Sequence, residues 1–169
     1  LALEAARQAP ERVRGIALMG SSARPDTPEL KRLRTDAIAL FEQGRMEEVL
    51  QANTLFAFHP AHAKRRDLID GYLGFVRAAG AAQLIRQNRA VMARPDLRPS
   101  LPALRCPLLV ACGEADLLTP VEHSREIAAL VPHARLEIVA GAGHMLTMEQ
   151  PARVNALLLA WLQGLPAGA

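Results

Sequence analysis

Three short, mostly apolar runs along the chain predict β-strands, and the second run, which is wholly apolar, is typical of a strand that is buried on both faces of a parallel sheet. They span residues 13–19, 108–112 and 136–140. The second run lies between Pro107 and Gly113, which bound it as a strand. The three runs therefore predict the strands of an α/β fold.

Helical stripes of apolar residues separate these runs. Residues 1–9 are alanine-rich, with Ala2, Ala5, Ala6 and Ala9 on one stripe, and Pro10 ends the helix. The segment Thr119-Pro120-Val121-Glu122 predicts a capping box with proline at the first helical position. A helical stripe follows it, formed by Ser124, Ile127, Ala128 and Val131. The last stripe, residues 151–163, predicts a helix that covers the sheet with Val154, Leu157, Leu158, Trp161 and Leu162.

The middle of the chain has a different character. Residues 26–94 contain no strand pattern and carry four helical stripes, at residues 30–41, 46–56, 68–76 and 84–92. A helical insert of this length between strands of one sheet is a separate subdomain rather than a simple crossover. We therefore predict an α/β core from residues 1–22 and 102–169, with a helical cap, or lid, over residues 23–101.

One acid and one histidine follow two successive strands. Asp116 lies just after the second predicted strand, and His144 follows the third strand and Gly141-Ala142-Gly143. Both loops lie at the carboxyl edge of a parallel sheet, where ligands bind. The β-α-β unit therefore predicts that Asp116 and His144 lie side by side, although they are 28 positions apart.

These motifs resemble the C-terminal part of α/β-hydrolase fold enzymes in the branch that carries a helical cap. G-E-A-D-L-L-T-P looks like the acid loop of that family, G-A-G-H like its histidine loop, and M-E-Q-P-A-R-V like the entry to its last helix. The order of the catalytic triad in the family is nucleophile, acid, histidine, so the resemblance implies that Asp116 and His144 are the second and third members. It also implies a fragment: the C-terminal part of the parallel sheet with an inserted all-helical cap.

The nucleophile expected from this resemblance is missing. Neither Ser21, Ser22, Ser100 nor Ser124 lies in G-x-S-x-G. The resemblance implies a Ser-Asp-His hydrolase that cleaves a small carboxylic ester or lactone, with its serine and oxyanion hole upstream of Leu1. The chain by itself is then expected to be inactive. Two alternatives stay open: an aspartate-nucleophile dehalogenase or epoxide hydrolase, and a non-catalytic binding protein of the same fold.

Other candidate residues lie near the same edge. We expect Ser21, Ser22, Leu117 and Met145 to line the substrate site. Glu114 competes with Asp116 as the acid. His59 and His62 have a spacing that a metal site can use, but Pro60 between them disfavours a helix, so we interpret them as surface residues without a metal. No cofactor is expected.

Composition limits the partners. The chain has 50% hydrophobic and 22% charged residues with a net charge of +3, which is ordinary globular usage. Aromatic residues make up only 4%, which argues against nucleic-acid binding, and no apolar stretch reaches the ~18 residues of a membrane span. Cys106 and Cys112 are too far apart along one strand for a disulfide, which favours buried free thiols and a cytoplasmic location. We expect a small-molecule substrate, the missing N-terminal segment of the fold as a partner, and possible homo-oligomers.

Overall fold

The computed structural model of the chain describes residues 1–166 and contains a three-stranded parallel sheet. The strands are β1 (Ile16–Met19), β2 (Leu108–Gly113) and β3 (Arg135–Val139), in the order β1-β2-β3. The register pairs Ile16 with Leu108 and Leu109 with Arg135. All three predicted strands are confirmed. β1 begins later than expected because a short 3-10 turn, Pro10–Arg12, precedes it.

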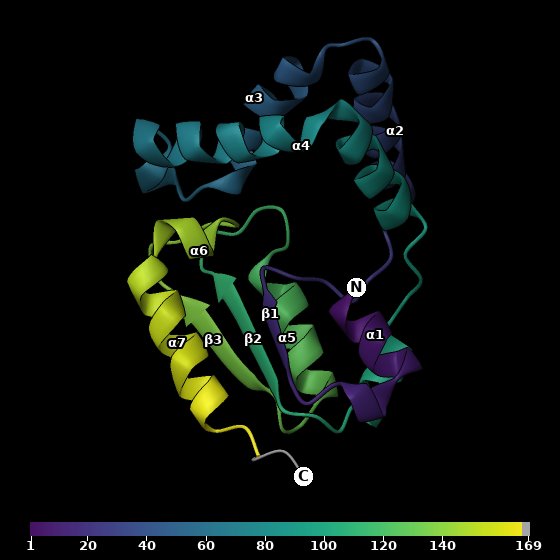
Figure 1. The fold of residues 1–169 in the computed structure, drawn as a ribbon, viewed down its shortest axis with the longest axis vertical. Helices are drawn as coiled ribbons and strands as arrows, with labels where there is room; N and C mark the ends of the chain where they lie inside the picture. The colour runs from purple at the N-terminus through teal and green to yellow at the C-terminus, as the bar shows by residue number, and fades with distance from the viewer. Residues whose placement is uncertain (167–169) are drawn as a thin grey trace.

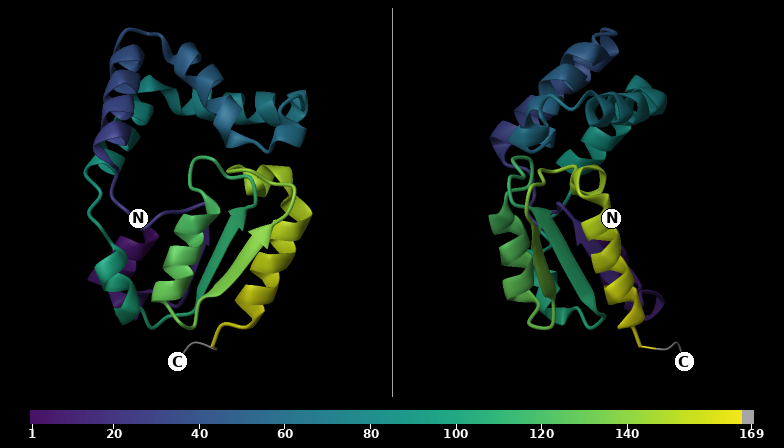
Figure 2. Two further views of the ribbon diagram at one scale, coloured as in Figure 1. Left: turned by 180° about the vertical axis from the view of Figure 1, so that it is seen from behind. Right: turned by 90° about the vertical axis from the view of Figure 1, so that its left-hand side faces the viewer.

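Every residue of the central strand β2 is buried, as its apolar run predicted. Leu108 and Val110 share a core cluster with Ile127 of α5 (Val121–Leu130) and with residues of α1 (Ala2–Gln8). Ala111 points to the other side, where Val154 of α7 (Pro151–Gln163) packs. Figure 2 shows α5 and α7 on opposite faces of the sheet. The core is therefore a three-layer α/β arrangement.

Two of the predicted helical stripes need correction. In α1 the buried residues are Leu3 and Ala6, so Ala6 is the one alanine of the predicted stripe that is buried. In α7 the predicted bounds are confirmed, and Val154 and Leu157 are buried, but Leu162 is 52% exposed. Leu162 therefore does not contribute to the core.

Three helices lie across the carboxyl ends of the strands (Figure 1). They are α2 (Pro28–Glu42), α3 (Met46–Ala57) and α4 (Arg66–Met92), which we call the cap helices. The third and fourth predicted stripes form one element, α4, which is broken at Gly80, where φ is +73°. Within residues 1–166 no helix has both the length and the apolar character that crossing a bilayer requires. The division at residues 22/23 and 101/102 stays a prediction.

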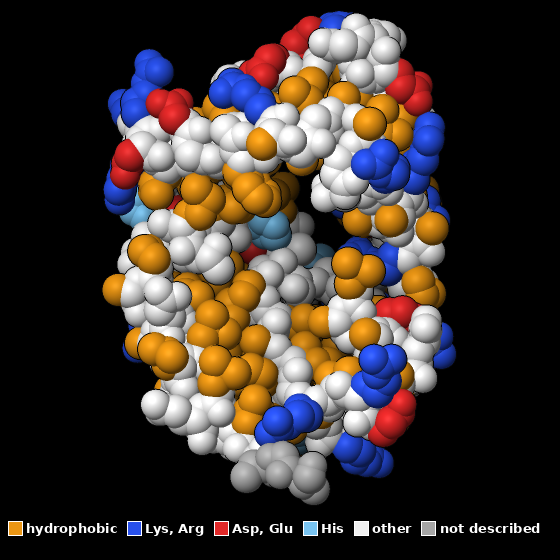
Figure 3. Space-filling view, viewed as in Figure 1, with side chains coloured by type: hydrophobic (Ala, Val, Ile, Leu, Met, Phe, Trp, Pro, Cys, Tyr) orange, Lys and Arg blue, Asp and Glu red, His pale blue; other side chains and the backbone are white. Residues whose placement is uncertain are grey.

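The chain passes from the core to the cap helices before α2 and returns to the core after α4, and the buried carboxylate of Asp26 joins these two connections. Asp26, just before α2, forms ion pairs with Arg34 of α2 and with Arg94, just after α4. The Leu97 amide also donates to the Ala23 carbonyl at 2.9 Å. The chain then returns to β2 through a 3-10 segment, Arg98–Ala103. This junction holds the cap helices at one side, and Figure 3 shows a hollow between them and the core.

Candidate active site

Asp116 is a buried carboxylate that four hydrogen bonds hold in place. It lies in the loop between β2 and α5 and is 3% exposed. Its Oδ1 accepts from the amides of Leu118 at 2.9 Å and Thr119 at 2.8 Å. Its Oδ2 accepts from the Thr119 hydroxyl at 2.9 Å and contacts His144. The carboxylate is therefore fixed in both position and orientation.

His144 lies against this carboxylate, as the β-α-β argument predicted. Its Nδ1 is 2.9 Å from Oδ2 of Asp116, and its side chain is 27% exposed. The two loops also contact through their backbones, because the Ala115 amide donates to the Ala142 carbonyl at 3.0 Å. With Nδ1 facing the carboxylate, Nε2 is the ring nitrogen left to exchange a proton with a substrate or nucleophile. The juxtaposition is confirmed, and the catalytic role of the pair stays a prediction.

The pKa of Asp116 reflects opposing effects. Burial by itself raises the pKa of this carboxyl. The hydrogen bond from His144, the backbone and hydroxyl hydrogen bonds from Thr119, and the attraction of the imidazole lower it, and together they hold the pKa below its ordinary value. Asp116 is therefore an anion at neutral pH, which is the state that can stabilise a protonated imidazole.

Thr119 has a different role from the one its sequence context predicted. The capping box is wrong: the cap residue of α5 is Pro120, and no side chain caps the helix. The Thr119 hydroxyl instead donates to Asp116 and lies 3.3 Å from Nδ1 of His144. The signal in the sequence was the spacing D-x-x-T, since an aspartate commonly accepts hydrogen bonds from residues two and three positions later.

Gly20, at the end of β1, lies directly against the acid–imidazole pair. A Cβ added there would stand 2.9 Å from Oδ2 of Asp116 and 3.0 Å from Nδ1 of His144. The backbone φ of +51° at Gly20 also disfavours any other residue. Gly20 therefore lets the backbone of β1 close over the hydrogen bond, a role that no local pattern indicated.

The competing acid, Glu114, contacts other groups. Its Oε1 accepts from the Gly141 amide at 2.7 Å and lies 3.7 Å from Nε2 of His59. It therefore supports the histidine loop from outside, whereas Asp116 contacts the imidazole itself. On this geometry Asp116 is the acid partner of His144.

The four predicted substrate contacts have different surroundings. Leu117 is 59% exposed beside the acid loop, and Met145 packs with the buried cluster of Phe58 and Leu68. The Ser21 hydroxyl donates to the Met19 carbonyl at 3.2 Å, and the Ser22 hydroxyl accepts from the Arg24 amide at 3.1 Å. Both serines are part-buried next to Gly20. Their contact with a substrate stays a prediction.

The interpretation of His59 and His62 as surface residues is wrong. Their side chains are 22% and 16% exposed, and Nδ1 of His62 lies 2.9 Å from a buried carboxylate oxygen of Glu149. The sequence argument missed this partner because Glu149 is 87 positions further along the chain. Among residues 1–166, no group of three or more His, Cys, Asp or Glu side chains is arranged to hold a metal ion.

The two cysteines are free thiols, as predicted. Cys112 is fully buried, and its sulfur lies 3.8 Å from Oδ2 of Asp116. Burial raises the pKa of the Cys112 thiol to about 11. Cys106 is only half-buried, which corrects the expectation that both thiols are buried. Cys112 is therefore a neutral packing residue beneath the acid loop.

Known proteins share this fold. The model of the alpha/beta hydrolase family matches residues 1–157. A pimeloyl-[acyl-carrier protein] methyl ester esterase of Xanthomonas oryzae pv. oryzae is 29% identical over 174 residues, which is 98% of this chain and 67% of that protein. A thermophilic esterase from Thermogutta terrifontis superimposes with a TM-score of 0.90 at 27% identity, covering 96% of this chain and 60% of that one.

A further structure shows the fold alone. The enol-lactonase from Burkholderia xenovorans LB400 superimposes with a TM-score of 0.82 at 22% identity, over 96% of this chain and 61% of that one. A curated relative from Caulobacter sp. (strain K31) is 28% identical, and the chain spans 58% of its length. The chain therefore spans about 60% of the length of these relatives.

The structure combines a parallel sheet, an aspartate–histidine contact between two of its loops, and a layer of helices over its carboxyl edge. The match over residues 1–157 is decisive: the chain belongs to the alpha/beta hydrolase family. Esterases and hydrolases are among its named relatives.

Proposed function

We propose that this chain supplies the acid and the histidine of a serine-type hydrolase that cleaves a small carboxylic ester or lactone. The observation that carries the proposal is the 2.9 Å contact between Nδ1 of His144 and Oδ2 of Asp116. In this proposal the nucleophilic serine and the oxyanion-hole donors lie outside the 169 residues, because no serine of the chain lies in G-x-S-x-G. The 169 residues alone are then expected to be inactive.

The chemistry follows from the two ring nitrogens of His144. Asp116 accepts a hydrogen bond from the Nδ1–H group of His144, so Nε2 carries the lone pair. Nε2 takes the proton of the serine hydroxyl as the serine oxygen attacks the ester carbonyl. Nε2 then donates this proton to the departing alcohol, which leaves an acyl-enzyme. Water repeats the cycle: His144 removes a water proton, the hydroxide attacks the acyl carbon, and the serine oxygen leaves with that proton.

Asp116 stabilises the imidazolium that forms in each step. Its four hydrogen bonds hold it anionic and in place, so that little reorganisation is needed as charge develops on the ring. The hollow under the cap helices (Figure 3) provides a place for a small acyl or lactone group near apolar side chains. Ser21, Ser22, Leu117 and Met145 are the proposed lining.

The test uses the complete gene product that contains this chain. With p-nitrophenyl acetate as substrate, His144→Ala is expected to lower kcat by about 10⁶. Equal activity of wild type and His144→Ala would remove His144 from the mechanism.

The aspartate-nucleophile alternative gives a different result in the same protein. A serine nucleophile is labelled irreversibly by a fluorophosphonate, whereas an aspartate nucleophile takes ¹⁸O from labelled water into its carboxylate during a single turnover. A protein that neither turns over esters nor takes either label would be the non-catalytic relative. Covalent labelling of a serine upstream of Leu1 is the result we expect.

A further inference from the structure

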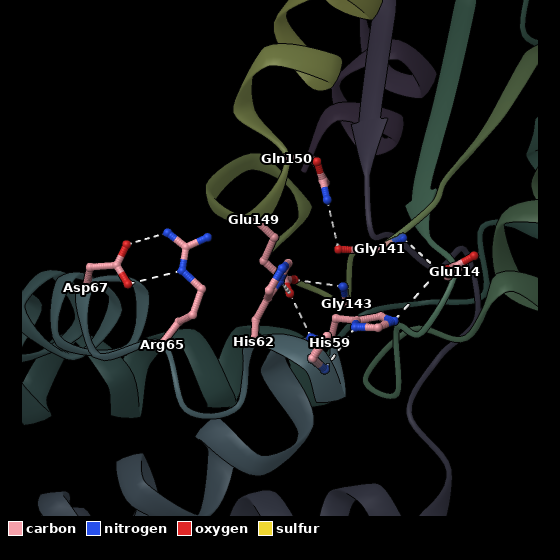
Figure 4. A network of polar contacts seen from close by, with 10 residues as sticks. His59, His62, Arg65, Asp67, Glu114, Gly141, Gly143, Glu149 and Gln150 are labelled. Atoms are coloured by element: carbon pink, nitrogen blue, oxygen red, sulfur yellow. Dashed lines mark hydrogen bonds and ion pairs between the residues drawn. The ribbon is translucent and has the colours of Figure 1, made fainter.

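Glu149 is a buried carboxylate that no step of the proposed reaction uses. It is the last residue of the short helix α6 (Leu146–Glu149), and its side chain has no exposed surface. Its Oε1 accepts from the Gly143 amide at 2.7 Å. Its Oε2 accepts from the His59 amide at 2.7 Å and lies 2.9 Å from Nδ1 of His62. One carboxylate therefore joins the histidine loop to the segment that follows α3 (Figure 4).

The same two segments approach closely on both sides of His144. A Cβ added at Gly143 would stand 2.6 Å from the backbone nitrogen of His59, so the two backbones are in direct contact. On the other side, the Met145 amide donates to the Ala57 carbonyl at 3.0 Å. Of the two neighbours of His144 in the chain, Met145 is therefore hydrogen-bonded to the end of α3, and Gly143 packs against the backbone just after it.

Packing reinforces this attachment. Phe58 is 3% exposed and stacks edge-on against Tyr72 of α4, with ring centroids 5.6 Å apart. Met145 and Met148 pack against the cluster that contains Phe58. The cap helices therefore rest on the histidine loop and α6, rather than only on the Asp26 junction at the opposite side.

Burying a carboxylate costs free energy unless hydrogen-bond donors surround it. Those donors therefore define the position of the carboxylate. For Glu149 the three donors come from two segments that are far apart in the sequence, and the amide of Gly143 is the one directly before His144. A displacement of the residue 57–62 segment would break the bonds from His59 and His62. It would also free the backbone on the Met145 side of the imidazole.

We propose that Glu149 is a positioning residue: its carboxylate couples the seating of the cap helices to the placement of the His144 imidazole. Movement of the cap then changes the position of the base, and an open cap frees the backbone on the Met145 side of His144. The inference rests on the proposed function only in taking His144 as the catalytic base. The coupling itself is a property of the fold and can be measured without turnover.

The first test measures backbone exchange in the complete gene product that contains this chain. In Glu149→Gln the amide group keeps the shape of the side chain but turns one acceptor into a donor that faces another donor. Residue-resolved amide hydrogen exchange by NMR is expected to quicken about tenfold or more at Gly143, His59 and Met145. The amide of Val110 in β2 serves as an internal reference and is expected to keep its rate. Unchanged exchange at Gly143 and His59 would overturn the inference.

Glu114→Gln is the matched control. Glu114 also accepts a backbone amide of the histidine loop, that of Gly141, but its side chain is 47% exposed. This variant is expected to quicken exchange at Gly141 and to leave Gly143 and His59 within about twofold of wild type. If Glu114→Gln changed Gly143 and His59 as much as Glu149→Gln does, the specific role of Glu149 would be wrong.

A milder variant covers the case in which Glu149→Gln does not fold. His62→Ala removes the side-chain donor and keeps both backbone donors to Glu149. We expect exchange at His59 and Gly143 to rise about threefold. Wild-type exchange at both amides in this variant would contradict the coupling.

The second test separates positioning from folding in the complete gene product. The number of competent sites is counted by stoichiometric labelling with a fluorophosphonate, and kcat is expressed per labelled site. Glu149→Gln is expected to keep nearly the full number of sites while kcat per site falls about tenfold or more. A purely structural role would lower the number of sites and leave kcat per site unchanged, and that result would overturn the inference.

The failure of the proposed function has a different signature. If the wild-type protein neither hydrolyses p-nitrophenyl acetate nor takes the label, then the serine-hydrolase proposal is wrong. The exchange measurements then decide alone whether Glu149 couples the cap helices to the histidine loop. If the wild-type protein is active and Glu149→Gln has the same kcat per labelled site, the proposed function is supported and the positioning role of Glu149 is wrong.

Discussion

Gly20 approaches His144 so closely that a Cβ at position 20 would lie 3.0 Å from Nδ1 of the imidazole. The same atom would lie 2.9 Å from Oδ2 of Asp116. The backbone at the end of β1 therefore covers the hydrogen bond between the two side chains, and water cannot approach it from that side. This arrangement joins all three strands in one site, because each strand end contributes one residue to it.

Gly20→Ala tests this close approach. The added methyl group is expected to push the carboxylate and the imidazole apart and to lower kcat of the complete protein about 100-fold, as misplacement of reacting groups by about 1 Å does. Because the backbone φ at position 20 is positive, the alanine is also strained in the folded state, which lowers the free energy of unfolding by about 1–2 kcal/mol.

The matched control for backbone strain is Gly44→Ala. Gly44 also has a positive φ, +75°, but nothing lies within 4 Å of an added Cβ. In urea titrations the Gly44→Ala variant is expected to lose a similar ~1 kcal/mol of stability, and in activity assays it is expected to keep the wild-type kcat. Equal loss of kcat in both variants would show that strain, rather than contact with His144, is responsible.

Thr119→Val tests the hydroxyl that supports Asp116. Valine keeps the shape of the side chain and removes the donor to Oδ2, which leaves the carboxylate with one fewer charge-assisted hydrogen bond. We expect kcat to fall about ten- to 100-fold. Thr119→Ser keeps the hydroxyl and is expected to stay within about threefold of wild type; a large loss in this variant would point to the methyl group instead.

Asp116→Asn tests both catalysis and the pH dependence of stability. The amide stabilises the wrong imidazole tautomer, so kcat is expected to fall about 10⁴-fold. Because the folded pKa of Asp116 lies below its ordinary value of 3.8, the ionised carboxylate stabilises the fold above about that pH. This stabilisation is lost as the pH falls through the lowered folded pKa.

The measurement is the urea midpoint of the chain at a series of pH values between 7 and 3. Wild type is expected to exceed Asp116→Asn by about 1.5–3 kcal/mol at pH 7. The difference should begin to shrink below about pH 4, since the Asp116 carboxyl of the unfolded chain then binds a proton while that of the folded chain is still ionised. A difference that stays constant over this range would mean that the charge of Asp116 does not stabilise the fold.

Cys112 is expected to resist alkylation in the folded chain. Its thiol is fully buried, and burial raises its pKa to about 11, so almost no thiolate is present at pH 8. Iodoacetamide followed by mass spectrometry should label Cys106 first and Cys112 only after unfolding in urea. Rapid labelling of Cys112 in the folded chain would show that the acid loop opens readily.

The contact between Asp116 and His144 could be predicted because it depends on one β-α-β unit, whose strands and helix follow one another in the sequence. The apolar run of β2 is buried throughout, so it is a central strand, and the loops after two successive parallel strands must meet at one edge. That rule placed Asp116 beside His144 without any knowledge of side-chain positions. The capping box failed for an equally physical reason: the Thr119 hydroxyl donates to the buried carboxylate of Asp116, and the first turn of α5 takes no side-chain cap.

The sequence by itself determined the class of fold, the three strands and the acid–histidine pair, since each depends on periodicity within a segment or on the short β-α-β connection. Only the tertiary structure decided that Gly20 closes over the pair and that Glu149 joins the histidine loop to the cap helices. The hydrogen bonds of Glu149 to His59 and His62 span 90 and 87 positions. No local pattern encodes such contacts, because they exist only once the cap helices have docked on the sheet.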